Sequence, residues 1–350
     1  MKYNEIGESG LRVSEICLGT MTFGTEYYNI GELESDQASR LVKRSIELGV
    51  NFFDTADVYS QGQSEKILGT AIKSSEKDRD KFVIATKVRN AMSSRAKQGK
   101  GDVNNLGLSR KHIMEGCKNS LRRLDTDYID LYQVHGWDHQ TPIEESLRTL
   151  NDLVRQGMVR YIGCSNWNAR HIMKAKYLCE ANGWESFISV QAYYNCVARD
   201  LEHEVTPLCQ EEGLGVLPWS PLAGGYLTGK FRRDRRDPED ARRSDYDFPP
   251  IDRELAFKTV DVMEEIAREE DCTIPQVALS WLRHQAVVPS VIIGARRIEQ
   301  LEENMGAAEL ELTEKQLRRI SSLTEPGDLY PQWMVQRHDR PDSFEYESPE

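Results

Sequence analysis

The sequence predicts a (β/α)8 TIM barrel, the α/β fold in which eight parallel strands form a barrel inside a ring of helices. Two observations predict it. Eight short, apolar, β-rich runs recur along the 350-residue chain, and segments with helical periodicity lie between them. The turn after the first run, LGTMTFGTEYYNIG, lacks the G-x-G-x-x-G pattern that a dinucleotide-binding doubly wound sheet, the main alternative, would need.

The candidate strands and helices follow one another along the chain. The strands are ICLGT (16–20), FFDTA (52–56), FVIATKV (82–88), DLYQVHG (130–136), YIGCSN (161–166), SVQAYYN (189–195), GVLPWSPL (215–222) and VIIGAR (291–296). The helices are expected at 35–49, 109–124, 142–157, 169–183 and 201–213, and several of them end at a glycine, as helix C-termini often do. This alternation is typical of a barrel with a parallel sheet.

The domain organisation follows from the placement of these units. We expect one domain over residues 1–350, with the barrel at about 16–310 and a C-terminal helix and tail at 311–350, because no internal linker marks a second domain. Residues 1–15 precede the first strand and are expected to form a β-hairpin around the Glu-Ser-Gly turn at 8–10. This hairpin would close the bottom of the barrel.

Two long insertions and the C-terminus lie outside the regular units. The insertions at 89–108 and 223–256 follow the third and seventh strands, and loops of this length are usually lids, binding loops or disordered segments. The segment at 313–323 is expected to form the added helix. The acidic tail at 338–350 is expected to be solvated, and the segment at 328–333 either shares this state or packs over the barrel mouth.

The composition excludes some classes of partner. A formal net charge of −12 and a pI near 5.3 give a field that repels phosphate, so we expect no general affinity for nucleic acid or for anionic membranes. The N-terminus lacks the apolar core of a signal peptide and no run approaches about 18 apolar residues, which predicts a cytoplasmic protein. Seven scattered cysteines without a CxxC pair indicate reduced thiols and no metal site.

Polar residues gather at the predicted C-terminal ends of the strands. These residues are Asp54, Lys87, His135, Ser165 with Asn166, Gln191, Ser220 and Arg296, and they belong to seven different strands. In a (β/α)8 barrel this face carries the active site. Burying charged groups at this rim without partners would cost folding free energy. Their convergence therefore predicts a functional site rather than a purely structural barrel rim.

The residue types at these ends suggest a proton-transfer site. Taken alone, Asp54 is more often a cap and Lys87 more often a surface lysine, but on adjacent barrel strands they can form an ion pair below Tyr59. A phenol titrates near pH 10, and a neighbouring ammonium favours the phenolate. Tyr59 is therefore a candidate general acid, and His135 a candidate hydrogen-bond donor to a substrate oxygen. A core histidine bonded to backbone is the alternative for His135.

At this point the chain resembles the aldo-keto reductase family, including its bacterial-type members and the potassium channel β-subunit branch. The motifs that carry the resemblance are DTADVY (54–59), ATK (85–87), VHGWD (134–138), GCSNW (163–167), WSPLAGGYLTGK (219–230) and GARRIEQLEENMG (294–306). The resemblance implies a catalytic tetrad of Asp54, Tyr59, Lys87 and His135. It also implies a nicotinamide cofactor, bound in extended form across the barrel mouth without a Rossmann fold.

The resemblance also implies which residues hold this cofactor. Ser165, Asn166 and Gln191 match the groups around the carboxamide, with Asp54 nearby, and Trp219 matches the aromatic on which the nicotinamide stacks, although many members have Tyr there. The remaining matches are Ser220, Pro221, Leu222, Gly224 and Lys230 around the pyrophosphate, Gly294, Arg296, Gln300, Glu303 and Asn304 at the adenosine end, and Thr20 and Met21 after the first strand.

The function implied is hydride transfer between NADP(H) and a carbonyl or alcohol. NADP(H) is expected because Arg296, at the start of a helix in an acidic protein, can pair with a 2′-phosphate. An alternative is a cofactor-bound regulatory subunit with little turnover, against which the presence of His135 argues. A metal-dependent hydrolase is disfavoured, because the rim offers too few His and carboxylate ligands. The substrate is left open among aryl aldehydes, small dicarbonyls and sugars, and so is a homo-oligomeric state.

Overall fold

The computed structural model of the protein describes residues 1–25, 33–233 and 248–337. Within them, eight parallel strands form one sheet: β3 (Ile16–Gly19), β4 (Phe52–Asp54), β5 (Val83–Val88), β6 (Ile129–Val134), β7 (Val159–Ser165), β8 (Phe187–Tyr193), β9 (Gly215–Trp219) and β10 (Val291–Ile293). Part of the insertion predicted at 223–256, residues 234–247, and the tail at 338–350 lie outside the described residues.

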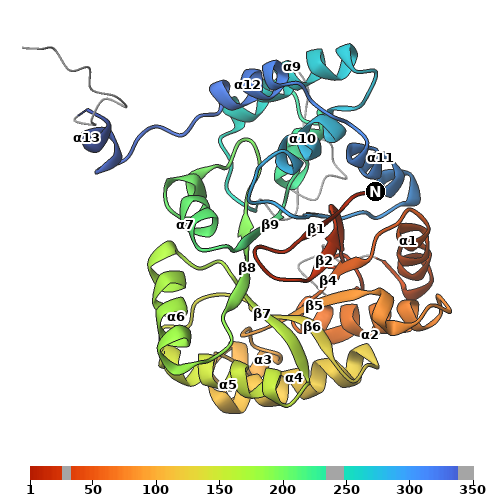
Figure 1. The fold of residues 1–350 in the computed structure, drawn as a ribbon. Coiled ribbons are helices and arrows are strands. Elements are labelled where there is room, and N and C mark those ends of the chain that lie inside the picture. Colours follow the sequence, from red (N-terminus) through yellow and green to blue (C-terminus); the bar gives the residue numbers. More distant parts are fainter. Residues whose placement is uncertain (26–32, 234–247, 338–350) are drawn as a thin grey trace, which may run out of the picture.

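The order of the strands makes the sheet a barrel. They are hydrogen-bonded in the order β10-β3-β4-β5-β6-β7-β8-β9, so the last barrel strand, β10, lies beside the first barrel strand, β3. Val291 of β10 is in register with Ile16 of β3, and Val216 of β9 donates its backbone N–H to Val287 just before β10. Helices surround this sheet (Figure 1). The predicted (β/α)8 barrel is confirmed.

The helices lie outside the barrel sheet, and α13 lies at the periphery of the molecule (Figure 1). They are α1 (Ser35–Glu47), α2 (Gln63–Lys73), α3 (Ser94–Lys97), α4 (Arg110–Leu124), α5 (Ile143–Arg155), α6 (Ala169–Asn182), α7 (Val205–Glu211), α9 (Arg253–Glu269), α10 (Ile274–Arg283), α11 (Ile298–Met305), α12 (Glu314–Leu323) and α13 (Gln332–Gln336). Short 3-10 turns are η1 (Tyr59–Gly62), η2 (Arg79–Lys81), η3 (Asp200–His203), η4 (Ala223–Thr228) and η5 (Gly306–Ala308). The helix expected at 201–213 is divided into η3 and α7. The helices α2, α3, α9, α10 and α13 were not predicted.

The predicted N-terminal hairpin is present. It consists of β1 (Tyr3–Glu5) and β2 (Arg12–Ser14), paired antiparallel, with a turn between them. Ile6 and Val13 are fully buried against inward-facing strand residues, among them Phe52 and Leu131. Glu8 also donates its backbone N–H to the carbonyl of Gly213, just before β9. The hairpin therefore closes the end of the barrel at which the strands begin.

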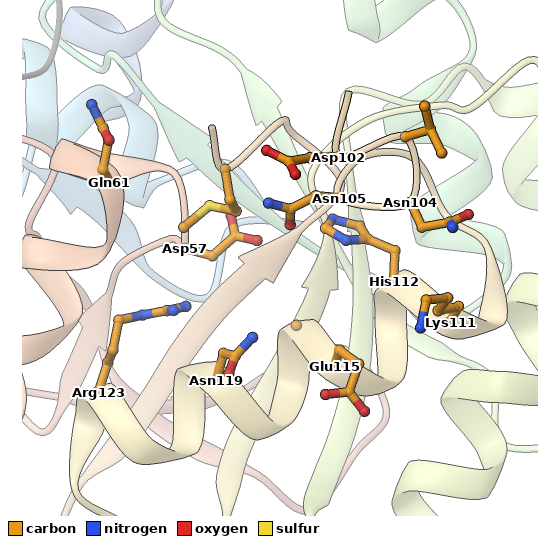
Figure 2. A pocket seen from close by; sticks show the side chains of 13 residues that line it. Asp57, Gln61, Asp102, Asn104, Asn105, Lys111, His112, Glu115, Asn119 and Arg123 are labelled. Atoms are coloured by element: carbon orange, nitrogen blue, oxygen red, sulfur yellow. The ribbon is translucent and has the colours of Figure 1, made fainter. Parts of the chain in front are cut away.

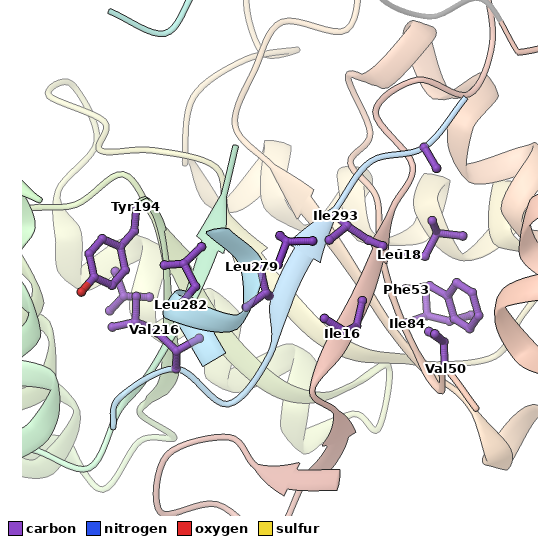
Figure 3. Close-up of a cluster of buried hydrophobic side chains, with 14 of the residues drawn as sticks. Ile16, Leu18, Val50, Phe53, Ile84, Tyr194, Val216, Leu279, Leu282 and Ile293 are labelled. Atoms are coloured by element: carbon purple, nitrogen blue, oxygen red, sulfur yellow. The ribbon is translucent and has the colours of Figure 1, made fainter. Parts of the chain in front are cut away.

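Strand alternation decides which side chains reach the barrel interior, because successive strand residues point to opposite faces. Phe52 and Leu131 belong to the inner cluster at the bottom of the barrel. Asp54 and Gln133 follow each of them by two residues and therefore share their inward direction. Phe53, by contrast, belongs to the outer cluster between strands and helices, which also contains Leu18, Ile84 and Leu279 of α10 (Figure 3).

The added C-terminal helix α12 begins where the sequence predicts. Thr313 accepts a hydrogen bond from the backbone of Gln316 and the Gln316 side chain accepts one from Thr313, which is a capping box. After it, Gln332 of α13 contacts the backbone oxygen of His203, while Tyr330 and Trp333 are exposed. In the described part of the chain, none of the helices is long and apolar enough to cross a membrane.

Candidate active site

A buried ion pair lies at the C-terminal end of the barrel interior. Lys87 Nζ donates to Asp54 Oδ2 at 2.6 Å, and both side chains are almost fully excluded from solvent. The two residues come from adjacent strands β4 and β5, where Asp54 is in register with Ala85 and Lys87 lies two residues closer to the mouth. A buried pair of this kind is stable only if its other hydrogen-bonding groups are also satisfied.

Those other groups are satisfied by inward-facing neighbours. Asp54 Oδ1 accepts from Gln191 Nε2 at 2.8 Å and from Gln133 Nε2 at 3.2 Å. Lys87 Nζ also donates to the backbone oxygen of Thr55 at 2.8 Å. Two neutral amides and one ammonium therefore hold a single carboxylate, and the Thr55 carbonyl and Asp54 together hold the ammonium in a fixed position.

The hydroxyl of Tyr59 is a third neighbour of the Lys87 ammonium, beside Asp54 and Thr55. This hydroxyl lies 3.4 Å from Lys87 Nζ, and the side chain of Tyr59 is 7% exposed. A tight turn follows it, in which Ser60 and Gln61 adopt positive φ angles of 45° and 54°. Ser60 is held in this turn by a hydrogen bond from its hydroxyl to the carbonyl of Phe23. The phenol is thus placed where an ammonium can stabilise its conjugate base.

His135 stands beside Tyr59, directly after β6. The two ring centroids are 5.8 Å apart with the planes at 79°. Burial, together with the positive charges of Lys87 and Arg89, lowers the pKa of His135 well below its ordinary value. The imidazole is therefore neutral near pH 7, and its Nδ1 lies 3.2 Å from Asn90 Nδ2. A neutral imidazole in this place can donate a hydrogen bond but cannot supply a charge.

A cavity of about 810 Å³ lies over the ends of β9 and β10. All the residues predicted for the pyrophosphate and adenosine ends of a cofactor line it: Ser220, Pro221, Leu222, Gly224, Lys230, Gly294, Arg296, Gln300, Glu303 and Asn304. Thr22 and Arg297, which the sequence did not single out, line it as well. The fold thus brings together the segments 220–230 and 293–304, which lie more than 60 residues apart in the sequence.

The chemistry of this cavity fits an extended, anionic dinucleotide. Lys230, Arg296 and Arg297 contribute three cationic groups against the one carboxylate of Glu303. Gly224 is in the left-handed region at φ 64°, and this conformation turns the backbone at the cavity wall. Beside Gly294 no atom lies within 4 Å of the place a Cβ would take, so the cavity has room for a close approach to the backbone.

The residues predicted to hold a carboxamide form a row along neighbouring strand ends. Asn166 donates from Nδ2 to Ser165 Oγ at 3.0 Å and accepts from Trp219 Nε1 at 3.1 Å. Trp219 is itself stacked with Tyr193, with centroids 4.9 Å apart, and with Phe248, at 6.0 Å. Part of the indole surface is thus covered by protein rings, and stacking of a nicotinamide on Trp219 stays a prediction.

The first predicted cofactor segment is arranged differently from the others. Thr20 is fully buried, and its hydroxyl contacts the backbone oxygen of Asp54 at 3.2 Å and the hydroxyl of Ser64 at 2.7 Å. Met21 is half-buried. Thr22, rather than Thr20, lines the cavity, and its buried hydroxyl has no hydrogen-bond partner among the described residues. Thr20 therefore supports the turn after β3, and Thr22 faces the space where a ligand would lie.

A second buried aspartate lies in the loop after β4. Asp57 is 1% exposed and borders a cavity of about 640 Å³ between that loop and α4, to which Asn105 and His112 also contribute (Figure 2). Neither carboxylate oxygen makes a hydrogen bond of normal geometry with any described residue. Burial, followed by the charge of Glu65, raises the pKa of Asp57 well above its ordinary value.

Sequence reasoning missed Gln133 and Asn90. Gln133 is fully buried, and the signal for it was a lone amide inside the apolar run DLYQV, two residues before His135. Asn90 opens the insertion at 89–108 and carries no pattern of its own. Its role becomes visible only from its contact with His135.

The rim beyond His135 is aromatic. The rings of Trp137 and His171 are stacked 3.6 Å apart at 4°, and Trp167 stands edge-on to Trp137 at 4.9 Å. These three rings therefore pack as one aromatic cluster in the loops that follow β6 and β7. Across residues 1–25, 33–233 and 248–337, no group of three or more His, Cys, Asp or Glu lies close enough together to hold a metal ion.

Comparisons with known proteins identify the family of the chain. The aldo/keto reductase family model matches residues 15–325. Versiconal hemiacetal acetate reductase of Aspergillus parasiticus is 34% identical, covering 95% of this chain and 99% of its own length, and an aldo-keto reductase of Alternaria alternata is 34% identical over 91% and 90%. A protein of Arabidopsis thaliana described as a probable voltage-gated potassium channel β subunit is 37% identical over 89% and 92%. The chain therefore belongs to the aldo/keto reductase family.

Proposed function

We propose that the protein is an NADP(H)-dependent oxidoreductase that interconverts aldehydes or ketones and alcohols, with Tyr59 as the general acid and base. One observation carries the proposal. Lys87 Nζ lies within hydrogen-bonding distance of both Asp54 and Tyr59, so a buried positive charge is fixed beside a phenol. This is the arrangement that a proton donor of high ordinary pKa needs in order to act near neutral pH.

In the reduction direction, each residue has a defined task. A bound nicotinamide would supply the hydride that reaches the carbonyl carbon. Tyr59 donates its hydroxyl proton to the carbonyl oxygen as that oxygen becomes an alkoxide, and Lys87 stabilises the phenolate that remains. Asp54 keeps the ammonium in place, while His135 donates a hydrogen bond that orients the carbonyl oxygen. Oxidation of an alcohol uses the same groups in reverse.

The cavity over β9 and β10 supports the cofactor part of the proposal. Lys230 and Arg296 would hold the phosphates of the dinucleotide, and Ser165, Asn166 and Gln191 would hold its carboxamide. Gln191 already donates to Asp54, so carboxamide binding and the proton-transfer pair share one amide. The tetrad and the cofactor site are therefore joined by a direct hydrogen bond.

A cofactor-bound regulatory subunit is the second candidate function, and the potassium channel relative supports it. The placement of His135 at 5.8 Å from Tyr59 favours the enzyme, because a regulatory subunit would have no use for a neutral donor beside the phenol. Steady turnover of a simple aldehyde with NADPH separates the two. A protein that binds NADPH but completes only one turnover would support the regulatory function.

The test of the tetrad is Tyr59→Phe. We expect carbonyl reduction to fall by about 10²–10⁴-fold, because general acid catalysis contributes about that much. NADPH affinity, measured by fluorescence titration, should stay near its original value, since the hydroxyl is proposed as a proton donor and not as a cofactor ligand. Tyr177→Phe, at an exposed tyrosine of α6, is the matched control. Near-normal turnover of Tyr59→Phe would contradict the assignment.

The preference for NADPH over NADH is tested at Arg296. Loss of one charge-assisted contact costs about 1.5–3 kcal/mol, so Arg296→Ala should weaken NADPH binding by roughly ten- to a hundredfold and leave NADH binding almost unchanged. Arg318→Ala, at an exposed arginine of α12, controls for the loss of one positive charge. An equal loss for both cofactors would show that Arg296 does not bind the 2′-phosphate.

The substrate is best sought by absorbance. Carbonyl compounds are screened for oxidation of NADPH, and alcohols and polyols for reduction of NADP. Dialysis against a chelator should leave turnover intact, because Tyr59 and His135 provide the electrophilic assistance in this proposal. Activity that disappears and returns with Zn²⁺ or Mg²⁺ would point to a metal-dependent reaction instead.

A further inference from the structure

Two residues just beyond β5 form a chain of hydrogen bonds that ends on His135. Arg89 donates from Nε to the backbone oxygen of Trp137 at 3.0 Å, and one of its terminal nitrogens lies 3.1 Å from Asn90 Oδ1. Asn90 Nδ2 in turn lies 3.2 Å from His135 Nδ1. These hydrogen bonds therefore connect the residues after β5 with the loop after β6, both at the ring of His135 and at the backbone of Trp137.

The guanidinium decides how the amide of Asn90 is oriented. Arginine offers only donors, so the amide atom that faces Arg89 must be the carbonyl oxygen. The nitrogen of the amide then faces His135, and an amide nitrogen can only donate. The orientation thus follows from the chemistry of Arg89 and not from the assignment of nitrogen and oxygen in the amide.

This orientation defines the proton on the imidazole. Because Asn90 donates to Nδ1, His135 must accept at Nδ1, and a neutral ring then carries its proton on Nε2. The ring is neutral because desolvation and the nearby positive charges of Lys87 and Arg89 lower the pKa of His135. Nε2 is then the ring nitrogen that can donate to a substrate oxygen, in a ring that stands beside Tyr59.

We propose that Asn90 is a positioning residue, which holds His135 in the tautomer with its proton on Nε2, and that Arg89 fixes the amide that does so. This inference rests on the proposed function, because it explains how His135 becomes a donor to the carbonyl oxygen. It assigns a role to the start of the insertion at 89–108. Asn90 itself does not touch the reacting atoms.

The test replaces the donor by an acceptor. In Asn90→Asp a carboxylate faces Nδ1, so the ring must carry a proton there. Nitrogen-15 NMR of labelled protein reports the protonation of each ring nitrogen, and the spectrum of His135→Gln identifies the signals of this histidine. We expect Nδ1 without a proton and Nε2 with one in the original protein, and the reverse, Nδ1 with a proton and Nε2 without one, in Asn90→Asp.

Turnover provides the second readout. We expect kcat/KM for a carbonyl substrate to fall by about tenfold in Asn90→Asp, the loss that corresponds to one hydrogen bond to the substrate. The dissociation constant for NADPH should not change. Asn90→Ala, which leaves Nδ1 without a fixed partner, should give a smaller loss and a mixture of tautomers. Asn104→Asp places the same charge at an exposed position of the same insertion and is the control.

The outcomes separate this inference from the proposed function. A proton on Nδ1 in the original protein would overturn it, whatever the turnover and even if the variants failed to fold. Unchanged ring signals and unchanged kcat/KM in Asn90→Asp, in an enzyme that Tyr59→Phe inactivates, would overturn it while the proposed function stands. If the protein reduced no carbonyl at all, the proposed function and the catalytic meaning of Asn90 would both fail.

Discussion

Two buried aspartates three residues apart, Asp54 and Asp57, have opposite surroundings. Asp54 ends β4, points into the barrel and accepts hydrogen bonds from Lys87, Gln133 and Gln191. Asp57 lies in the following loop, faces the cavity beside α4, and makes no hydrogen bond of normal geometry with any described residue (Figure 2). One carboxyl is part of a fully bonded network, and the other is buried with its hydrogen-bonding capacity unused.

The difference comes from the direction in which each residue leaves the strand. Inward positions of neighbouring barrel strands lie side by side, so donors on β5, β6 and β8 converge on Asp54. The loop beyond the strand end has no such regular neighbours. Arg123, one of the basic side chains that border the cavity of Asp57, donates instead to Glu65 and to Ser120. A barrel therefore supplies hydrogen-bond partners to a buried carboxylate at a strand end far more readily than to one in the following loop.

The largest expected effect removes the cation of the bonded network. Lys87→Met should reduce carbonyl turnover by about 10²–10⁴-fold, because Tyr59 loses the charge that stabilises its phenolate. Lys81→Met, at an exposed lysine just before β5, is the matched control and should keep full activity. Steady-state kinetics with NADPH measures both. A Lys87→Met enzyme with the original rate would mean that the ion pair serves only the fold.

The next effect removes the carboxylate of the same pair. Asp54→Asn leaves Lys87 buried without its counter-charge, and breaking a buried pair in this way costs about 3–5 kcal/mol of unfolding free energy. Denaturant titration followed by circular dichroism would report it. Asp57→Asn is the natural comparison, because it makes the same chemical change three residues along. Equal losses at both positions would mean that the two aspartates do not differ as their hydrogen bonds indicate.

The smallest effect is expected for Asp57→Asn, which should raise the unfolding free energy, whereas Asp54→Asn should lower it. The folded-state pKa of Asp57 is raised, so above the ordinary value of 3.8 the folded protein keeps a proton that the unfolded chain releases, and stability falls as pH rises through that window. Asp57→Asn removes this dependence. It should therefore raise the unfolding free energy by about 1 kcal/mol near pH 7 and change it little near pH 4.

Thermal unfolding of both proteins between pH 4 and pH 8 measures this difference. The gap in Tm between Asp57→Asn and the original protein should widen with rising pH. A gap that stays constant, or one that narrows, would show that Asp57 is ionised and paired in the folded protein.

The fold was readable from the sequence because barrel strands are short apolar runs, and each of the eight was found. Helix α2 was missed because Gly62 and the tight turn before it interrupt the pattern, and α9 because it begins within the insertion at 223–256. In the site, Asp54 and Lys87 could be paired from strand adjacency alone. Gln133 and Asn90 could not, because the roles of neutral amides depend on which atoms face them.

The barrel is complete only when its last strand, β10, has paired with its first strand, β3. The hydroxyl of Ser290 donates to the backbone oxygen of Ser14 across 276 residues of chain, and β10 pairs with β3 immediately beyond. At about 5–20 residues per second, roughly 15–55 s of synthesis separate these partners. Until then β3 has an open edge, which is a site for wrong pairing. Closure of the barrel, and with it the assembly of the cavity over β9 and β10, is therefore a late event in the life of the nascent chain.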